Sequence, residues 1–97
     1  MHACALEIEL RLPSCRSLKA KRAIVRPIVD RVRGRHPVAI SEVGHLDDWQ
    51  RAVLGVAAVG GSPGGVTDQL DRVERIVWSS AEIEVVRADR TWMELDP

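Results

Sequence analysis

Aromatic residues are scarce in this chain of 97 residues: phenylalanine and tyrosine are absent, and three tryptophans are present. RRM-type sheets bind single-stranded RNA by stacking bases on exposed aromatic side chains, so the sequence argues against that mode of binding. Cysteine is also rare, and Cys4 and Cys15 are too few for the disulfide framework of a small secreted domain. No CxxC pair occurs, which excludes a zinc ribbon and a thioredoxin-type redox site.

Long apolar segments are missing as well. The longest mostly apolar run, residues 52–59, covers eight positions, whereas a helix that spans a bilayer needs about 20. The N-terminal segment lacks the basic and then apolar layout of a signal peptide. Hydrophobic residues make up 45% of the chain and charged residues 29%, values typical of an ordinary soluble domain. We therefore expect one cytoplasmic domain over residues 1–97, with no membrane contact.

Hydrophobic periodicity predicts four strands and two helices. Residues 3–12 alternate between apolar and polar types as in a strand with one buried face, and residues 51–59 are apolar on both faces, as in a central strand. The order β-α-β-β-α-β predicts an α+β, ferredoxin-like sandwich, with both helices on one face of a four-stranded antiparallel sheet. The expected elements are strands at 3–12, 38–44, 51–59 and 83–88, and helices at about 18–34 and from 63 onward.

Single residues predict local details of these elements. Ser17 and Ser62 are typical helix N-caps, and Gly34 suits the C-terminal cap of the first helix. Pro27 removes one hydrogen bond from the interior of that helix, so we expect a kink or a restart there. Gly55, inside the apolar third strand, indicates a bulge or the close approach of another element.

A formal net charge of zero conceals an uneven distribution of charge along the chain. Residues 1–10 sum to −2, residues 11–35 to +8 and residues 36–97 to −6. Charge asymmetry of this kind bears on the choice of partner, because a basic block attracts anionic partners while the acidic remainder limits nonspecific binding to nucleic acid.

The basic block lies largely on the first helix. On a helical wheel, Lys19, Arg22, Arg26 and Arg33 form a stripe beside the apolar one, and such a row of cations can meet successive phosphates. A solvated face that only keeps the protein soluble is the alternative. The candidate nucleic-acid-binding residues are Arg16, Lys19, Lys21, Arg22, Arg26 and Arg33.

The face of the sheet away from the helices is expected to expose apolar residues. Because two helices cover only one face, the other would show Ala3 and Ala5 beside the third strand, and an exposed apolar face usually marks an interface. A homodimer is the simplest cover; the alternative is that residues 90–97 fold across this face. The candidate dimer-interface residues are Val53, Ala57, Val59 and Trp92, with Trp49 also at the margin.

The polar segment at residues 45–50 is the weakest candidate site. His45 with Asp47 or Asp48 could bind a metal or form an acid–base pair, but a carboxylate that caps the turn through local hydrogen bonds is the simpler interpretation. Cys15 has no candidate base near it in the sequence, and GGSPGG lacks the lysine and spacing of a phosphate-binding loop. We expect no catalytic residue, no metal, no cofactor and no small-molecule ligand.

Two stretches resemble a known family. LRLPSCRSLKAKR and EVGHLDDWQRAVLGVAAV are similar to the start and the centre of the YlxP-like bacterial proteins, through the joint pattern of SLKxKR and DxWQ. The resemblance implies a ferredoxin-like fold, no assigned catalytic residue, and a translation-linked role, since the family's genes often lie among those for translation and ribosome-maturation factors. Pro27 departs from the family pattern. The matching positions include the family-motif residues Glu42, Asp48, Trp49 and Gln50.

These observations lead to three hypotheses about function. The first is a small non-enzymatic cytoplasmic protein, expected as a dimer, that contacts RNA or the ribosome through the basic face of the first helix. The second is a homodimeric structural or protein-interaction module that acts through the apolar sheet face. The third, which we disfavour, is an enzyme or metal site around His45, Asp47 and Asp48.

Overall fold

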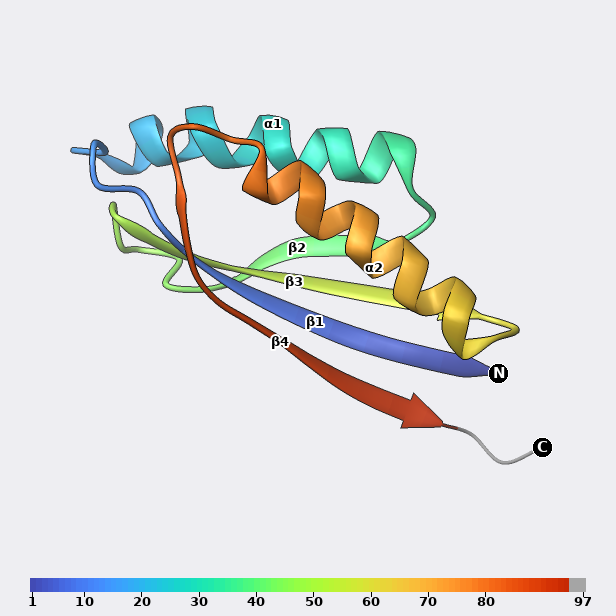
Figure 1. Cartoon of the computed structure of the whole chain (residues 1–97). Helices are drawn as coiled ribbons and strands as arrows, with labels where there is room; N and C mark the ends of the chain where they lie inside the picture. Colours follow the sequence, from blue (N-terminus) through green and yellow to red (C-terminus); the bar gives the residue numbers. More distant parts are fainter. Residues whose placement is uncertain (95–97) are drawn as a thin grey trace.

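The computed structural model describes residues 1–94 and contains the six expected elements in the expected order (Figure 1). The ferredoxin-like prediction is confirmed. No helix in the described part of the chain is long and apolar enough to cross a membrane. The elements are β1 His2–Arg11, α1 Leu18–Arg35, β2 Ala39–Gly44, β3 Arg51–Gly60, α2 Pro63–Trp78 and β4 Glu84–Glu94.

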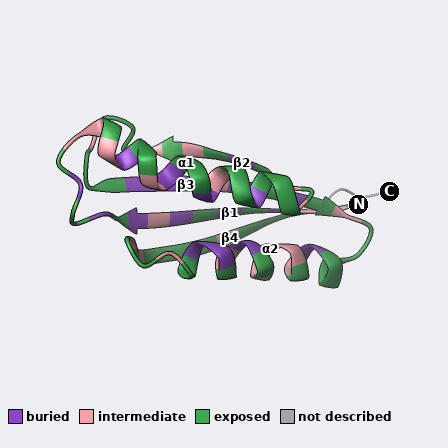
Figure 2. Cartoon of the chain, turned by 90° about the horizontal axis from the view of Figure 1, so that it is seen from above, coloured by how far each residue is buried: buried purple, intermediate pink, exposed green. Residues whose placement is uncertain are grey.

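The four strands form one antiparallel sheet in the order β2-β3-β1-β4, with β1 and β3 in the centre as expected. Both helices lie on one face of this sheet, α1 on the β2 side and α2 on the β4 side (Figures 1 and 2). We call the other face the open face. Leu6 pairs with Val56 and Ile8 with Leu54. Since cross-strand partners share a face, these side chains all point toward the helices.

The core between the sheet and the helices follows the predicted apolar stripes. β1 contributes alternate residues from Cys4 to Leu10, all at most 1% exposed. Figure 2 marks buried positions in purple along β1 and along both helices. Each buried Val, Leu or Ile side chain contributes about 1.5–3 kcal/mol of transfer free energy. The helices contribute Val25, Ile28 and Val32 from α1, and Val66, Leu70, Val73, Ile76 and Val77 from α2.

Both predicted N-caps are present. The Ser17 hydroxyl accepts a hydrogen bond from the Ala20 backbone N–H at 3.0 Å, and the Ser62 hydroxyl accepts one from the Gly65 N–H at 3.1 Å. Each cap satisfies a backbone donor that the first turn of a helix leaves without a partner. Pro63 follows in the first turn of α2 as expected.

The predictions for the middle and the end of α1 need correction. α1 is one continuous helix from Leu18 to Arg35, so of the two alternatives expected at Pro27, a kink or a restart, the restart is wrong. Pro27 lies on an exposed part of the helix, where water can solvate the carbonyl that the proline leaves without a donor. His36, rather than Gly34, is the C-cap, and its backbone N–H donates to the Val32 carbonyl.

Gly55 marks a close approach between neighbouring strands. A Cβ atom at this position would lie 2.9 Å from a Val43 methyl carbon, closer than carbon atoms pack without displacement. Val43 sits at the irregular end of β2, where the register with β3 shifts between Glu42 and Gly44. The close approach predicted from Gly55 is therefore confirmed, and the accompanying bulge lies on the neighbouring strand.

β4 is longer than the sequence indicates. Residues 90–94 continue the strand and pair with β1 up to the His2–Glu94 pair. They therefore do not fold across the open face, which corrects the alternative considered for the C-terminal residues. Leu95, expected in that segment, lies outside the described residues.

Candidate functional site

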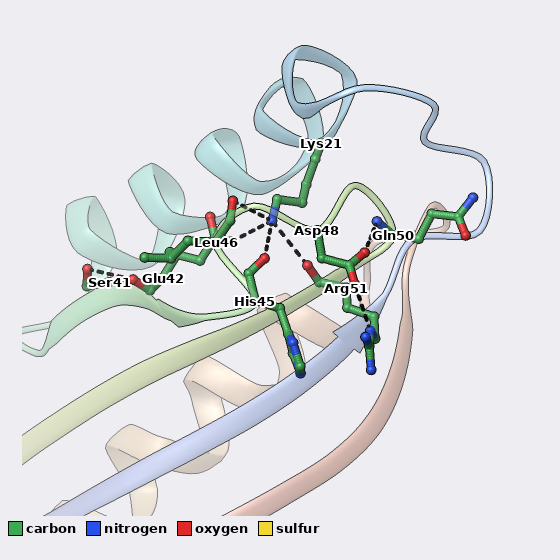
Figure 3. Close-up of polar contacts among 8 residues, drawn as sticks. All are labelled: Lys21, Ser41, Glu42, His45, Leu46, Asp48, Gln50 and Arg51. Carbon is green, nitrogen blue, oxygen red and sulfur yellow. Dashed lines mark hydrogen bonds and ion pairs between the residues drawn. The ribbon is translucent and has the colours of Figure 1, made fainter.

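The basic block of the sequence divides into buried and exposed members. Lys21 is only 1% exposed, and its side chain passes from α1 to the turn between β2 and β3 (Figure 3). Its ammonium group donates hydrogen bonds to the carbonyl oxygens of His45 at 2.9 Å, Leu46 at 3.4 Å and Arg51 at 3.1 Å. These bonds tie the β2–β3 turn to the first helix.

A carboxylate neutralises the buried charge of Lys21. The Lys21 Nζ lies 2.8 Å from Glu42 Oε2, and the Glu42 side chain keeps 21% of its surface exposed. A buried ammonium group is costly unless it is paired and hydrogen-bonded, and Lys21 meets both conditions. Lys21 therefore does not belong to the candidate nucleic-acid-binding set, and its inclusion is corrected.

Three neighbouring cations on α1 are exposed and face solvent. Lys19, Arg22 and Arg26 make no ion pair or side-chain hydrogen bond within residues 1–94. At 1.5 Å of rise per residue, their Cα atoms are spaced by roughly 4.5 and 6 Å along the helix. They line a shallow groove of about 400 Å³ together with Ala23 and Pro27. We call these three residues the α1 basic strip.

Arg16 and Arg33, the remaining candidates, are exposed but partly engaged. Arg33 Nη2 donates to the Ile40 carbonyl at 2.9 Å, and its Nη1 lies 3.9 Å from Asp30. Arg16 Nη1 donates to the carbonyls of Pro13 at 2.9 Å and Cys15 at 3.1 Å. Both guanidinium groups therefore have a structural role and retain further donors toward solvent.

The polar turn before β3 is held by local hydrogen bonds, as the simpler interpretation predicts. Asp48 accepts from the Gln50 backbone N–H at 2.8 Å and from Arg51 Nε at 2.9 Å (Figure 3). The Gln50 amide donates to the carbonyls of Cys15 at 3.2 Å and Pro13 at 3.4 Å. The Gln50 backbone bond, and then Arg51, hold the pKa of Asp48 below its ordinary value of 3.8.

His45 points toward a different carboxylate from those considered for a site. Its Nε2 lies 3.6 Å from Glu9 Oε1 on β1, and it adopts a left-handed backbone conformation with φ of 54°. The His45 carbonyl accepts from the Asp48 backbone N–H at 3.0 Å, which closes a turn. Within the described part of the chain, no group of three metal-ligating side chains is assembled.

The assignment of Asp48 to the family motif is wrong, because the spacing of the motif selects a different aspartate. In a DxWQ pattern ending at Trp49 and Gln50, the aspartate falls on Asp47, and Asp48 occupies the variable position. Asp47 is exposed and accepts no hydrogen bond or ion pair within residues 1–94. Trp49 is 50% exposed, so the turn presents one acidic and one aromatic side chain to solvent.

The open face carries an apolar hollow that only partly matches the expected one. Ala57 and Val59 are exposed there, Val59 to 60%, whereas Val53 is only 8% exposed. The prediction that Trp92 lies on the open face is wrong. Trp92 pairs with Cys4 and therefore lies on the helix-covered side of the sheet. Val43 is part of this face and was not anticipated. A hollow of about 360 Å³ is lined mainly by Ala5, Ala39, Ser41, Val43, Gly55 and Ala57.

Fold and site together define a small ferredoxin-like domain with an exposed basic helix face. Residues 3–90 match the family described as "Protein of unknown function (DUF503)", and the chain belongs to this family. It is 38% identical over 86 residues to "Uncharacterized protein YlxP" of Bacillus subtilis (strain 168), covering 89% of this chain and 94% of that protein. The resemblance to YlxP-like proteins is therefore confirmed.

Solved structures with the same fold are distant in sequence. The de novo designed protein Foldit4 superposes with a TM-score of 0.55 at 11% identity, covering 97% of this chain and 99% of that one. A de novo designed protein with a ferredoxin fold, LFR1 1, gives 0.54 at 16% identity and covers 96% and 84%. These similarities concern the fold alone, because fold does not determine function.

Proposed function

We propose that this protein binds RNA, without catalysing a reaction, through the α1 basic strip. The observation that carries the proposal is the state of Lys19, Arg22 and Arg26, which are exposed, adjacent on one helix face and without an anionic partner among the described residues. Basic side chains placed in this way bind phosphates through charge, and this term supplies most nonspecific affinity for nucleic acid.

The chemistry of the strip favours backbone contacts over base recognition. No aromatic residue lies within α1, so the strip offers no stacking platform for single-stranded bases. Guanidinium and ammonium groups on one line position a protein on phosphates without reading sequence. The proposed binding is therefore sequence-independent and strongly dependent on salt.

Ribosomal RNA is the RNA class that the family context favours. The resemblance to the YlxP-like family implies a translation-linked role, since genes of that family often lie among those for translation and ribosome-maturation factors. The acidic remainder of the chain, with a net charge of −6 over residues 36–97, would limit attachment to phosphate surfaces in other orientations. We infer a ribosome-associated accessory factor that docks with α1 toward RNA.

Charge reversal on the two helices tests this proposal. R22E/R26E on α1 and R72E/R75E on α2 change the net charge equally, and all four arginines are exposed. We expect cosedimentation with ribosomes and binding to ribosomal RNA fragments to be lost in the α1 variant and retained in the α2 variant. Binding that persists in the α1 variant, or falls equally in both, contradicts the proposal.

A homodimer through the open face is the second candidate. It is supported by the apolar hollow around Ala57, by the exposed Val59 beside it and by Met93, which pairs with Ala3 on the same face and is 63% exposed. Burial of such a face in a second copy would remove apolar surface from water. Light scattering should give a dimer for the wild type and for A81E, and a monomer for A57E; a wild-type monomer at high concentration contradicts it.

A further inference from the structure

Three arginines converge at the end of the sheet where β1 finishes and β3 begins. They line a cleft of about 530 Å³, which we call the arginine cleft and which shares no residue with the groove of the α1 basic strip. The basic members come from three separate segments of the chain. The lining residues are Arg11, Pro13, Arg16, Asp48, Gln50 and Arg51.

The register of the sheet places two of these cations directly opposite each other. Arg11 pairs with Arg51 across β1 and β3, and like charges in this arrangement are unfavourable. Asp48 pairs with Arg51 at 2.9 Å, but Arg11 has no ion pair within residues 1–94, although Glu84 is its partner in the register with β4. The cleft therefore holds three cations against one carboxylate.

The existing hydrogen bonds hold Arg16 and Arg51 in place and leave some of their donors free. Arg16 uses Nη1 for the carbonyls of Pro13 and Cys15, and Arg51 uses Nε for Asp48. The Gln50 amide bonds the same two carbonyls and so connects the loop before α1 to the turn before β3. A guanidinium group has five donors in a rigid fork that matches phosphate oxygens, and each arginine keeps N–H groups for a ligand.

We propose that the arginine cleft binds a phosphate group, held by Arg11, Arg16 and Arg51. An anion between Arg11 and Arg51 removes the repulsion that the sheet register imposes on them, and the cleft is wide enough for a phosphate with its hydration. A phosphomonoester fits the charge best, because its dianion balances the two cations that Asp48 leaves uncompensated. The proposal does not depend on RNA binding by the α1 basic strip.

The source of the phosphate is either free inorganic phosphate or the terminal phosphate of a nucleic acid. Calorimetric titrations with inorganic phosphate, with a 5′-phosphorylated RNA trinucleotide and with its 5′-hydroxyl counterpart distinguish the two. Saturable binding of inorganic phosphate supports the site with a free ligand. Binding of the trinucleotide that requires its 5′-phosphate supports the site with a nucleic-acid end. Absence of saturable binding by both phosphate probes overturns the proposal.

Substitutions separate a phosphate site from a structural role of the arginines. R11Q and R51Q should each weaken phosphate binding by about tenfold or more, since one charge-assisted hydrogen bond accounts for that factor, whereas R72Q on α2 should bind as the wild type does. R11Q should also melt no lower than the wild type without phosphate, because it relieves like-charge repulsion, and should lose the rise in Tm that phosphate gives the wild type. Phosphate binding that R11Q and R51Q leave unchanged contradicts the site.

Discussion

Replacing Lys21 by methionine tests whether the buried ammonium group holds the β2–β3 turn to α1. Methionine has nearly the same length and helix propensity as lysine, so the substitution removes the charge and leaves the helix intact. It deprives Glu42 of its ion pair at 2.8 Å and three carbonyl oxygens of a donor. Removing one partner of a buried pair costs about 3–5 kcal/mol. Because Glu42 is 21% exposed and can be hydrated, we expect a loss of about 3 kcal/mol.

This loss is large against the total stability of a small domain, about 5–15 kcal/mol. In urea denaturation, where the free energy of unfolding falls by about 1–3 kcal/mol per molar, the midpoint of K21M should drop by about 1 M or more. Its Tm should fall by roughly 12 °C or more. R22M is the matched control, since Arg22 is the next residue on α1 and is exposed, and it should stay within about 0.5 kcal/mol of the wild type.

A double-mutant cycle identifies the contribution of the ion pair. E42Q alone leaves Lys21 with its three carbonyl acceptors and without a carboxylate, and K21M/E42Q removes both charges. If the two groups interact directly, the double variant should lose less stability than the sum of the single variants. A K21M variant as stable as R22M, or strictly additive losses in the cycle, would refute the structural role assigned to Lys21.

Three further predictions concern other local contacts. S17A should lower the free energy of unfolding by about 0.5–2 kcal/mol in chemical denaturation, because it removes the hydroxyl that caps α1; an unchanged stability contradicts the cap. P27A should stabilise the protein by up to about 3 kcal/mol, because it restores a helical hydrogen bond at an exposed position; a lower Tm contradicts this. The pKa of Asp48 is lower in the folded state than its unfolded value near 3.8, so the ionised carboxylate stabilises the fold above that value and the stabilisation is lost as the pH falls through the folded pKa. D48N should therefore reduce the loss of unfolding free energy at acid pH. A pH dependence of stability that D48N leaves unchanged contradicts this.

The fold can be predicted from the sequence because the patterns that indicate helices and strands involve residues close together along the chain. Alternation along β1 and the apolar stripes of both helices identify the buried faces without knowledge of tertiary contacts. The position of Lys21 was also available from the sequence. On the helical wheel it falls at about 300°, inside the apolar stripe and away from Lys19, Arg22 and Arg26. The position of Lys21 on the inward face of the helix, rather than its being a lysine, indicates that its side chain is buried.

Other features of the site depend on register and could not be predicted. The face on which Trp92 lies follows from its pairing with Cys4, and a register shift between Glu9 and Leu10 changes the relation between the β4 sequence and the two faces. The opposition of Arg11 and Arg51 likewise requires knowledge of the β1–β3 register. Neither the face of Trp92 nor the opposition of Arg11 and Arg51 can be read from the distribution of residues and charges along the sequence.

Several residues that carry the family resemblance now have a common physical role. Lys21, Glu42 and Gln50 join α1, the loop before it and the β2–β3 turn through their side chains. Ser17 caps the helix that supplies Lys21. The fold therefore explains this part of the pattern. Lys19 and Arg22, two members of the α1 basic strip, are exposed residues of the pattern that remain available for a partner.

The salt dependence of RNA binding tests the central proposal most directly. For single strands, the logarithm of the binding constant falls with the logarithm of salt concentration by about 0.7 for each phosphate contacted. If Lys19, Arg22 and Arg26 each meet a phosphate, K19Q/R22Q/R26Q should reduce the slope by about 2, and R72Q/R75Q should leave it unchanged. A slope that the α1 variant shares with the wild type would contradict the assignment of RNA binding to this strip.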